Sequence, residues 1–250
     1  MTGFKFYRTF KQQKNLPIMN NIFLQYMSER MKQEHLAHKE PGPVITISRE
    51  YGCYASKIAK LLVEKLNHAQ KGHSSQNNSE WHYITKEILE EASQKLQTDP
   101  EKISHIFGAT QKDFLHDLIE SFSTKRYASD SNIKRTIKLV VQSYAEQGRV
   151  IIVGRAGCIL AKHIPKSFHF KLTAPFEWRV ERIMERFNLE PPNAKKQVLE
   201  NDERRKNFMN FFKGNKPDCT LFDAVFNRST MSDEEIVESV FKIVQLRKII

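Results

Sequence analysis

The sequence predicts an α/β fold in which a parallel sheet is covered by helices on both faces. Three short apolar runs, at residues 44–47, 150–153 and 168–172, have the length and composition of buried strands. Between and after them, apolar residues recur at helical spacing. Short apolar strands that alternate with helices are typical of a parallel sheet with helices on each side.

Composition and charge describe a globular chain with an anionic partner. Of its 250 residues 40% are hydrophobic, which is enough for a sizeable core, so disorder of the whole chain is excluded. At about 150 residues per domain, this length predicts one large domain or one domain with an appendage. The 40 basic and 29 acidic side chains give a net charge of +11, which favours a nucleic acid, a membrane surface or a phosphorylated small molecule as the partner.

Features of membrane and secreted proteins are missing from the sequence. No stretch approaches the roughly 20 apolar residues that span a bilayer, and the first residues lack the apolar run of a signal peptide. Cys53, Cys158 and Cys219 lie far apart without a C-x-x-C pair, so neither a disulfide framework nor a cysteine zinc site is predicted. We therefore expect a cytoplasmic protein with free thiols and no membrane partner.

Residues 1–40 are predicted to form an extension before the main domain. They are basic and polar, and within them residues 20–39 place apolar side chains at helical spacing. Pro41-Gly42-Pro43 then breaks any helix. The extension is a candidate for an oligomer contact or a cover for an apolar patch.

The main domain is predicted to span residues 43–250. Along it we expect a strand at 44–47, a helix at 55–66, a polar loop at 71–80, a largely helical stretch at 85–145, strands at 150–153 and 168–172, helices at 175–187 and 194–212, a strand at 221–226 and a helix at 232–246. Ser232 followed by Glu235 has the pattern of a capping box, which predicts where the last helix begins.

A candidate phosphate-binding turn follows the first strand directly. Residues 48–57 read SREYGCYASK and lead into a helix, whose N-terminal backbone N–H groups can bind a phosphate. A full glycine-rich phosphate loop would read G-x-x-x-x-G-K-[ST], whereas here only Gly52 remains of the glycines and the nearest lysine is Lys57. Taken alone, the turn is equally consistent with an ordinary connection between strand and helix.

Two further segments place arginines where ligands can be bound. Gly154-Arg155 follows the strand at 150–153, and ligands of open α/β sheets bind at the carboxyl ends of strands. Arg204 and Arg205 lie on the predicted helix at 194–212, where a solvated charged face is the usual explanation. Each alone could be a surface charge.

In their order along the chain, these segments resemble the cytidylate kinase-like family over about residues 43–247. The resemblance is carried by Ile45-Thr46-Ile47-Ser48-Arg49-Glu50-Tyr51-Gly52, Val153-Gly154-Arg155, Ala174-Pro175 with Arg179 and Arg182-Ile183, Asp202-x-x-Arg205, Phe222-Asp223 and Asn227-x-Ser229. It implies a three-layer sandwich of the P-loop NTPase type with a five-stranded parallel sheet. It also implies a helical monophosphate-binding region at about 68–147 and a lid at about 188–215.

The resemblance also implies an activity and a set of site residues. The activity is transfer of the ATP γ-phosphoryl group to a nucleoside monophosphate, with Mg²⁺ carried by the nucleotide and no metal site in the protein. Phosphoryl transfer depends on positioning and charge neutralisation, which arginine forks supply. The donor phosphates would be held by Arg49, Gly52, Cys53, Tyr54, Ala55, Ser56 and Lys57. The monophosphate and lid site would be Arg155, Arg179, Arg182, Asp202 and Arg205, and the catalytic residues would be Lys57, Arg155, Arg204 and Arg205.

The turn departs from the family pattern. Similar family members carry Gly-Ser-Gly-Gly-Arg there, whereas this chain has GCYAS at residues 52–56, without the last two glycines and the basic residue. The catalytic lysine of a cytidylate kinase loop falls at Ala55, so Lys57 is the candidate substitute. Thr85 stands where the family carries an aspartate. Glycine's tolerance of positive φ is lost at Tyr54.

Three functions are therefore open from the sequence. The first is a nucleoside monophosphate kinase with nucleotide substrates. The second is a non-catalytic nucleotide-binding or regulatory protein on the same scaffold, which the altered turn favours. The third is nucleic-acid binding by the basic surface, which is disfavoured because the basic residues are scattered among carboxylates and no nucleic-acid motif is present.

Several other side chains have structural interpretations. Phe208, Phe211 and Phe212 lie at helical spacing and are expected to pack the lid helix against the core. His163 and His169 are expected to be core or surface residues rather than metal ligands. Cys53 lies at a helix N-terminus near basic residues, so we expect its thiol to ionise easily.

Overall fold

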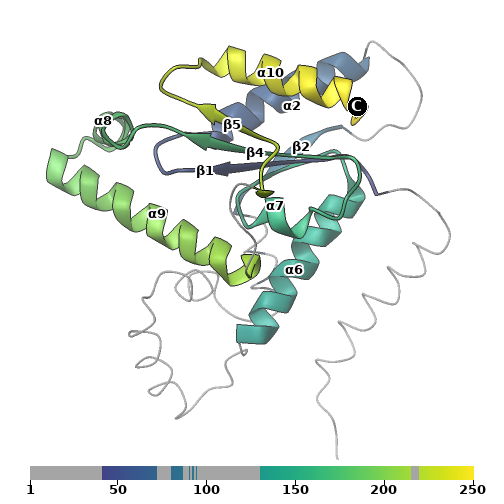
Figure 1. The fold of residues 1–250 in the computed structure, drawn as a ribbon, viewed down its shortest axis with the longest axis horizontal. Coiled ribbons are helices and arrows are strands. Elements are labelled where there is room, and N and C mark those ends of the chain that lie inside the picture. Colours follow the sequence, from purple (N-terminus) through teal and green to yellow (C-terminus); the bar gives the residue numbers. More distant parts are fainter. Residues whose placement is uncertain are drawn as a thin grey trace, which may run out of the picture. The chain divides into compact units, whose positions relative to one another are not determined.

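The computed structural model describes residues 41–71, 80–86, 90, 92, 94, 130–214 and 220–250 (Figure 1). The chain divides after Glu40, and every described residue belongs to the second unit, Pro41–Ile250. The predicted helix at 20–39, most of the polar loop at 71–80 and most of the stretch before residue 130 lie outside the described residues. None of the helices in the described ranges has the length and apolar character needed to cross a membrane.

A five-stranded parallel sheet forms the centre of the unit, which confirms the predicted fold class. Its strands lie in the order β2 (His82–Ile84), β3 (Val150–Val153), β1 (Val44–Arg49), β4 (Ser167–Thr173) and β5 (Ala224–Asn227). Each neighbouring pair is parallel. The central strand, β1, is therefore flanked by two strands that come more than 100 residues later in the chain.

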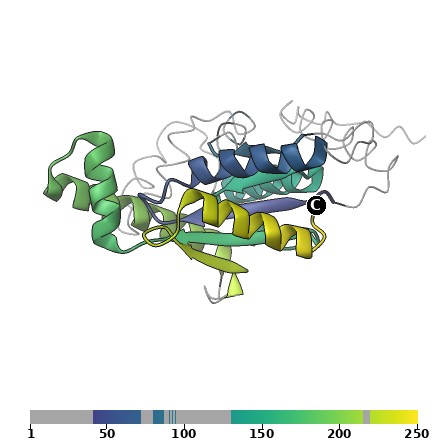
Figure 2. The ribbon, with the colours of Figure 1, turned by 90° about the horizontal axis from the view of Figure 1, so that it is seen from above.

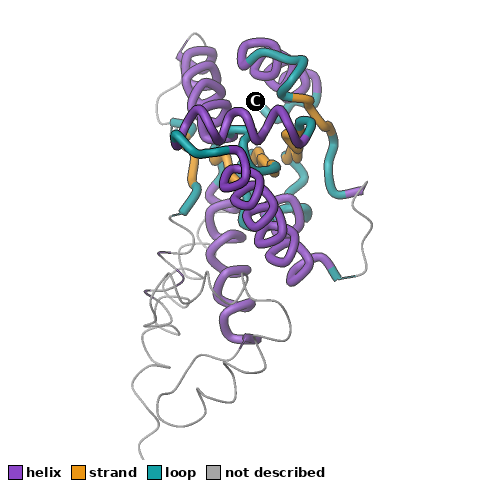
Figure 3. The backbone as a smooth tube through the Cα atoms, turned by 90° about the vertical axis from the view of Figure 1, so that its left-hand side faces the viewer, coloured by secondary structure: helices purple, strands orange, loops and turns teal. Residues whose placement is uncertain are grey.

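Helices cover both faces of the sheet. On one face α2 (Ala55–Lys71) packs beside α10 (Asp233–Leu246), and on the other lie α6 (Asp130–Gln147) and the short α7 (Gly157–Leu160) (Figures 1 and 2). The tube view shows the strands enclosed between these two helical layers (Figure 3). The predicted arrangement with helices on both faces is confirmed.

The last two helices lie at one end of the sheet. α8 (Phe176–Phe187) and α9 (Pro191–Lys213) pack against each other at the carboxyl ends of β1 and β4 (Figure 1). Prolines occupy the first positions of α9, where their missing N–H groups leave no hydrogen bond unmade, so this helix begins three residues before the predicted start at 194. This end of the sheet is where α/β proteins bind ligands.

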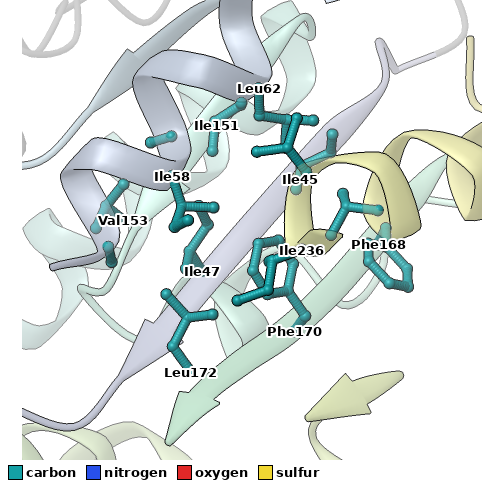
Figure 4. Close-up of a cluster of buried hydrophobic side chains, with 14 of the residues drawn as sticks. Ile45, Ile47, Ile58, Leu62, Ile151, Val153, Phe168, Phe170, Leu172 and Ile236 are labelled. Atoms are coloured by element: carbon teal, nitrogen blue, oxygen red, sulfur yellow. The ribbon is translucent and has the colours of Figure 1, made fainter. Parts of the chain in front are cut away.

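Successive side chains of the strands point to opposite faces of the sheet, which produces one hydrophobic core on each face. Ile45 and Ile47 of β1 pack with Phe168 and Phe170 of β4 beneath α2 and α10, and Figure 4 shows these side chains pointing toward Ile58 and other helical residues. Val44 faces the opposite core, under α6 and α7. Complete burial of such an aliphatic side chain stabilises the fold by about 1.5–3 kcal/mol, so both helical layers are firmly attached.

Most predicted boundaries agree with the structure, and the differences have local causes. The capping box is confirmed: the Ser232 hydroxyl accepts from the Glu235 N–H at 3.1 Å, and the Glu235 carboxylate accepts from the Ser232 N–H at 2.8 Å. β5 begins at Ala224 rather than 221, because Asp223 bonds to the backbone of His169 through both its N–H and its carboxylate before the regular ladder starts. Neither β2 nor α7 was predicted as an element, because two of the three β2 residues are exposed and α7 is a single turn.

Candidate functional site

The connection between β1 and α2 is a tight turn with two residues in the left-handed region. Gly52 has φ +92°, and a Cβ at this position would lie 3.0 Å from the Cβ and carbonyl oxygen of Arg179. Tyr54 has φ +48°, so the turn keeps a left-handed residue here although the glycine that tolerates this conformation is absent. A non-glycine residue pays about 1–2 kcal/mol for this conformation. Tertiary contacts of the Tyr54 side chain offset the cost.

Tyr54 fastens the turn to α8. Its hydroxyl donates to the carbonyl oxygen of Arg182 at 2.6 Å, and the guanidinium of Arg186 lies 4.9 Å from its ring centroid. A pocket of about 500 Å³ opens beside these contacts, on the side of the turn that faces α2 and α8. Its lining is Tyr54, Ser56, Lys57, Arg182, Glu185 and Arg186, which we call the outer pocket.

The basic residues of the outer pocket are largely engaged by carboxylates. The Lys57 ammonium lies 2.6 Å from Asp233, at the first turn of α10, and 67% of the lysine side chain is exposed. Arg182 lies 2.7 Å from Glu185. Burial raises the pKa of Asp233, but its bonds to Lys57 and Arg228 outweigh this and lower it overall. Lys57, the candidate substitute for the lysine that the phosphate-binding turn lacks, is thus held at the N-terminus of α10.

Cys53 is fully buried inside the turn. Burial, together with the negative charge of Glu50, raises the pKa of its thiol to about 11. The prediction of an easily ionised thiol is therefore wrong, because desolvation of a thiolate outweighs the arginines nearby. No group of three or more histidine, cysteine or acidic side chains among the described residues could hold a metal ion.

Hydrogen bonds join the turn to α8 and α9, between the outer pocket and the α9 side of the turn. The Tyr51 N–H donates to Asp202 at 2.7 Å, and Arg179 donates both to the Tyr51 carbonyl oxygen at 3.1 Å and to the Asp202 carboxylate. Arg179 also donates to the Ala174 carbonyl oxygen at 3.1 Å, and only 7% of it is exposed. Arg179, predicted at the monophosphate site, therefore connects α8, α9 and the turn.

Glu50 is a site residue that the sequence analysis did not single out. Its carboxylate accepts from the Thr173 hydroxyl at 2.7 Å and lies 3.2 Å from the Lys171 ammonium. Burial raises the pKa of Glu50, but the hydrogen bond from Thr173 and the charge of Lys171 lower it overall. Both Glu50 and Lys171 line a second cavity on the α9 side of the turn. Only the order of the strands brings these two residues together, so no spacing in the sequence indicates the pair.

Three arginines meet in that second cavity, which has a volume of about 670 Å³ and which we call the basic cavity. They are Arg49 at the end of β1, Arg155 after β3 and Arg205 on α9. Burial lowers the pKa of Arg49 well below its usual value, and the charges of Arg205 and Arg155 lower it further. Three guanidinium groups this close to one another repel, and an anion between them would relieve the repulsion.

The chain fixes these arginines by backbone contacts. Arg205 donates to the Arg49 carbonyl oxygen at 3.3 Å and lies 5.1 Å from the Tyr51 ring centroid. Arg155 donates to the Thr85 carbonyl oxygen at 3.3 Å. Gly154 has φ +79°, and a Cβ there would lie 1.9 Å from Nη1 of Arg49. A glycine at this position therefore leaves the space that the Arg49 guanidinium occupies.

Further basic residues extend the cavity along α9. Arg204, Lys206 and Lys213 line it, together with Lys171 of β4. Of these, only Arg204 was predicted as a site residue. Phe208 is buried in the core beside α6, with Phe211 and Phe212 packed against it, so the prediction that these rings attach the helix to the core is confirmed. Most of the predicted residues line one of two places. Arg49, Arg155, Asp202, Arg204 and Arg205 line the basic cavity, and Tyr54, Ser56, Lys57 and Arg182 line the outer pocket. Gly52, Cys53, Ala55 and Arg179 line neither.

Comparisons with known proteins identify the family and the fold. A family model described as the cytidylate kinase-like family matches residues 44–230. A cytidylate kinase from Methanocaldococcus jannaschii is 25% identical over 207 residues, which cover 80% of this chain and 94% of that protein. A crystal structure of an uncharacterized protein from Eubacterium ventriosum matches with a TM-score of 0.56 at 18% identity, over 81% of this chain and 98% of that one. The structural likeness supports the fold alone.

Proposed function

Because this chain belongs to the cytidylate kinase-like family, we propose that it transfers the γ-phosphoryl group of ATP to a nucleoside monophosphate bound in the basic cavity. The observation that carries the proposal is the convergence of Arg49, Arg155 and Arg205. Arginine forks grip phosphate oxygens in bidentate fashion and keep their charge, so three of them form a site for a phosphate dianion. The relative from Methanocaldococcus jannaschii, a cytidylate kinase, supports the same class of acceptor.

In this reaction an oxygen of the bound monophosphate attacks the γ-phosphorus of ATP. The bond from that phosphorus to the oxygen bridging to the β-phosphate breaks, and ADP leaves with the electron pair. Arg155 and Arg205 would neutralise charge on the acceptor phosphate, which otherwise repels the incoming phosphoryl group. Magnesium would arrive bound to ATP and neutralise the donor phosphates.

The donor phosphates would lie at the N-terminus of α2. This helix has no acidic residue in its first turn, so its dipole favours an anion there. Ser56 and Lys57 belong to the same turn, and Arg182 and Arg186 line the outer pocket beside it. For Lys57 to reach a phosphate, its ammonium must exchange Asp233 for the ligand, which its high exposure permits.

A second candidate function is nucleotide binding without transfer. It is favoured by Ala55 standing where the lysine is expected and by the ion pair between Lys57 and Asp233. A scaffold of this kind would keep the basic cavity and lose only the donor side. Such a protein would be stabilised by a nucleotide and would release no ADP.

The first test is an ADP-release assay with ATP and Mg²⁺ against each nucleoside monophosphate, paired with thermal shifts by the same ligands. We expect release that depends on a monophosphate. Arg155→Met should reduce kcat/KM by more than tenfold, because one phosphate-binding fork is lost. Arg135→Met is the matched control, because Arg135 is exposed on α6 and does not line the cavity.

Variants of the turn separate the two candidate functions. If Lys57 substitutes for the missing lysine, Lys57→Met abolishes transfer, whereas Lys60→Met on the same exposed face of α2 does not. If transfer appears only after Tyr54→Gly, Ala55→Gly and Ser56→Arg are combined, the natural protein binds nucleotides without catalysis. Thermal shifts without ADP release in the unaltered protein would reject the transferase.

A further inference from the structure

We infer that Tyr51 is a positioning residue of the proposed acceptor site, which holds α9 against the turn so that Arg205 faces the phosphate of the bound nucleotide. The inference rests on the proposed function, because it assigns Arg205 to that phosphate. Tyr51 belongs to the turn between β1 and α2, yet it lines neither the basic cavity nor the outer pocket. It therefore acts on the ligand only through the residues that it contacts.

The segment of α9 that carries Arg205 lies between two apolar attachments. Near the N-terminus of the helix, Ala194 and Val198 pack in a cluster with residues of α8. Figure 1 shows α9 running from α8 toward α6, and there Phe208 is buried in the core. Val198 and Phe208 are about 15 Å apart along the helix. Leu199 is the only aliphatic side chain between them, and 59% of it is exposed. Other contacts must therefore hold this segment on the turn.

Tyr51 contacts this part of α9 with its backbone, its hydroxyl and its ring. The N–H of Tyr51 donates to the Asp202 carboxylate at 2.7 Å, and its hydroxyl accepts from the side-chain amide of Gln197 at 2.9 Å. The centroid of its ring lies 5.1 Å from the Arg205 guanidinium. Contacts at three positions of α9 fix both the place of the helix along its axis and its rotation relative to the turn. One residue of the turn thus sets the direction in which Arg205 leaves the helix.

The contact between the ring and Arg205 is compatible with a bound phosphate. The guanidinium is attracted to the ring through its charge, so it can keep this contact while its N–H groups bind phosphate oxygens. Burial lowers the pKa of Arg205, and the charge of Asp202 opposes this. The bond from Arg205 to the Arg49 carbonyl oxygen is 3.3 Å long, which is beyond the usual 2.9–3.0 Å and typical of a weak bond. The ring of Tyr51 is therefore an important support for the guanidinium.

A double-mutant cycle on the full chain tests whether Tyr51 acts through Arg205. We would titrate CMP, AMP, GMP and UMP by calorimetry into Tyr51→Leu, Arg205→Met and the double variant, at constant salt. Each single variant should bind the monophosphate about tenfold more weakly than the wild type. The double variant should bind about as weakly as Arg205→Met alone, because the ring then has no guanidinium to position. A loss of about a hundredfold, the product of two independent effects, would overturn the inference.

The matched control is the same cycle with Arg155. This arginine also lines the basic cavity, but it follows β3 and donates to the Thr85 carbonyl oxygen. The losses of Tyr51→Leu and Arg155→Met should therefore multiply to about a hundredfold. Equal coupling of Tyr51 to Arg155 and to Arg205 would mean that Tyr51 supports the cavity as a whole, and would reject its specific role. Should Tyr51→Leu fail to fold, Tyr51→Met takes its place in both cycles.

Two further variants separate positioning from packing. Tyr51 also packs against the apolar cluster between α8 and α9, and so does Met184 of α8, which lines neither cavity. Met184→Ala should lower stability in urea unfolding and bind monophosphates as tightly as the wild type. Tyr51→Phe keeps the ring and loses the bond from Gln197, so its affinity should lie within about threefold of the wild type. Equal losses of affinity in Met184→Ala and Tyr51→Leu would assign Tyr51 to packing alone.

The proposed function and the role of Tyr51 fail in different ways. If the unaltered protein binds none of the four monophosphates, the basic cavity is not an acceptor site, and the proposed function falls together with the role of Tyr51. Monophosphate binding with independent effects of Tyr51 and Arg205 keeps the acceptor site and rejects Tyr51 as its positioning residue. Binding without ADP release rejects the transferase, whereas the cycles, which measure affinity, still decide the role of Tyr51.

Discussion

The two sides of the turn after β1 differ in how far carboxylates balance their positive charge. In the outer pocket, Lys57 and Arg182 lie against carboxylates. The described lining of the basic cavity has seven basic side chains and two carboxylates, Glu50 and Asp202, and the charges of Arg155 and Arg205 lower the pKa of Arg49. A pair with a carboxylate cancels the field that an anionic ligand would feel, whereas cations that outnumber the carboxylates leave a net positive field.

This difference indicates which half of the site is ready for its ligand. The basic cavity presents oriented cations before any ligand arrives, so a phosphate gains affinity without reorganising the protein. The outer pocket must first exchange internal ion pairs for ligand contacts. Under the proposed function, the acceptor site is therefore oriented before its ligand binds, whereas the donor site must first rearrange.

The largest expected effect comes from closing the space that Arg49 occupies. Gly154→Ala would place a Cβ 1.9 Å from Nη1 at the end of the Arg49 side chain, so the guanidinium must move from its present position. We expect loss of binding of nucleoside monophosphates by about thirtyfold, the equivalent of about 2 kcal/mol for a charge-assisted contact. Calorimetric titration measures it.

Gly214→Ala is the control for backbone strain. Gly214 also has positive φ, but nothing lies within 4 Å of its added Cβ. Both variants should lose stability in urea unfolding because of the backbone conformation alone, by about 1–3 kcal/mol. Only Gly154→Ala should lose ligand binding, and equal binding by the two variants would remove Arg49 from the site.

The next effect concerns the pH dependence of stability, which depends on a buried histidine in β4. His169 lies two residues before Lys171 on the same face of β4, 1% exposed, with its Nδ1 2.8 Å from the Thr46 hydroxyl. Burial lowers its pKa to about 4, with smaller contributions from neighbouring charges. Between pH 6.5 and 4 the unfolded chain therefore binds the proton more readily, so stability falls as the pH falls through this window.

The His169→Gln variant tests this sign. The wild type should lose about 2 kcal/mol more than the variant between pH 7 and pH 4.5 in urea unfolding. Parallel pH profiles of the two proteins would show that His169 does not titrate differently in the folded state.

The fold was largely predictable from the sequence. The site was predictable only from the order of its motifs along the chain and their resemblance to a known family. Strands β1 and β3 are continuous β-branched runs, which identify buried strands without any tertiary information. β2 has three residues, two of them exposed, and carries no such signal. The bond between the Tyr51 N–H and Asp202 joins residues 151 positions apart, and only the folded chain shows it. The sequence also does not indicate that Lys206 and Lys213 line the basic cavity, because lysines on one face of a helix are common on solvated helices.

A smaller effect is expected from the hydrogen bond that joins the turn to α8. Tyr54→Phe removes the hydroxyl that donates to the Arg182 carbonyl oxygen at 2.6 Å, so we expect a loss of about 1 kcal/mol in urea unfolding. Tyr83→Phe, at an exposed position on β2, should lose less than half of that. Equal losses would mean that the hydroxyl does not hold the turn against α8, and that the outer pocket opens more easily than its contacts suggest.

The smallest change is expected at Cys53, and it tests whether the turn stays closed. With the thiol pKa near 11, the thiolate fraction at pH 8 is about a hundredfold lower than for an ordinary cysteine. Alkylation of Cys53 by iodoacetamide, followed by mass spectrometry of its peptide, should therefore be at least tenfold slower in the native protein than in urea. Cys53→Ser should leave the binding of monophosphates unchanged, because Cys53 does not line the basic cavity. Rapid native alkylation would mean that the turn opens in solution, and the contrast between a fixed basic cavity and a closed donor side would no longer hold.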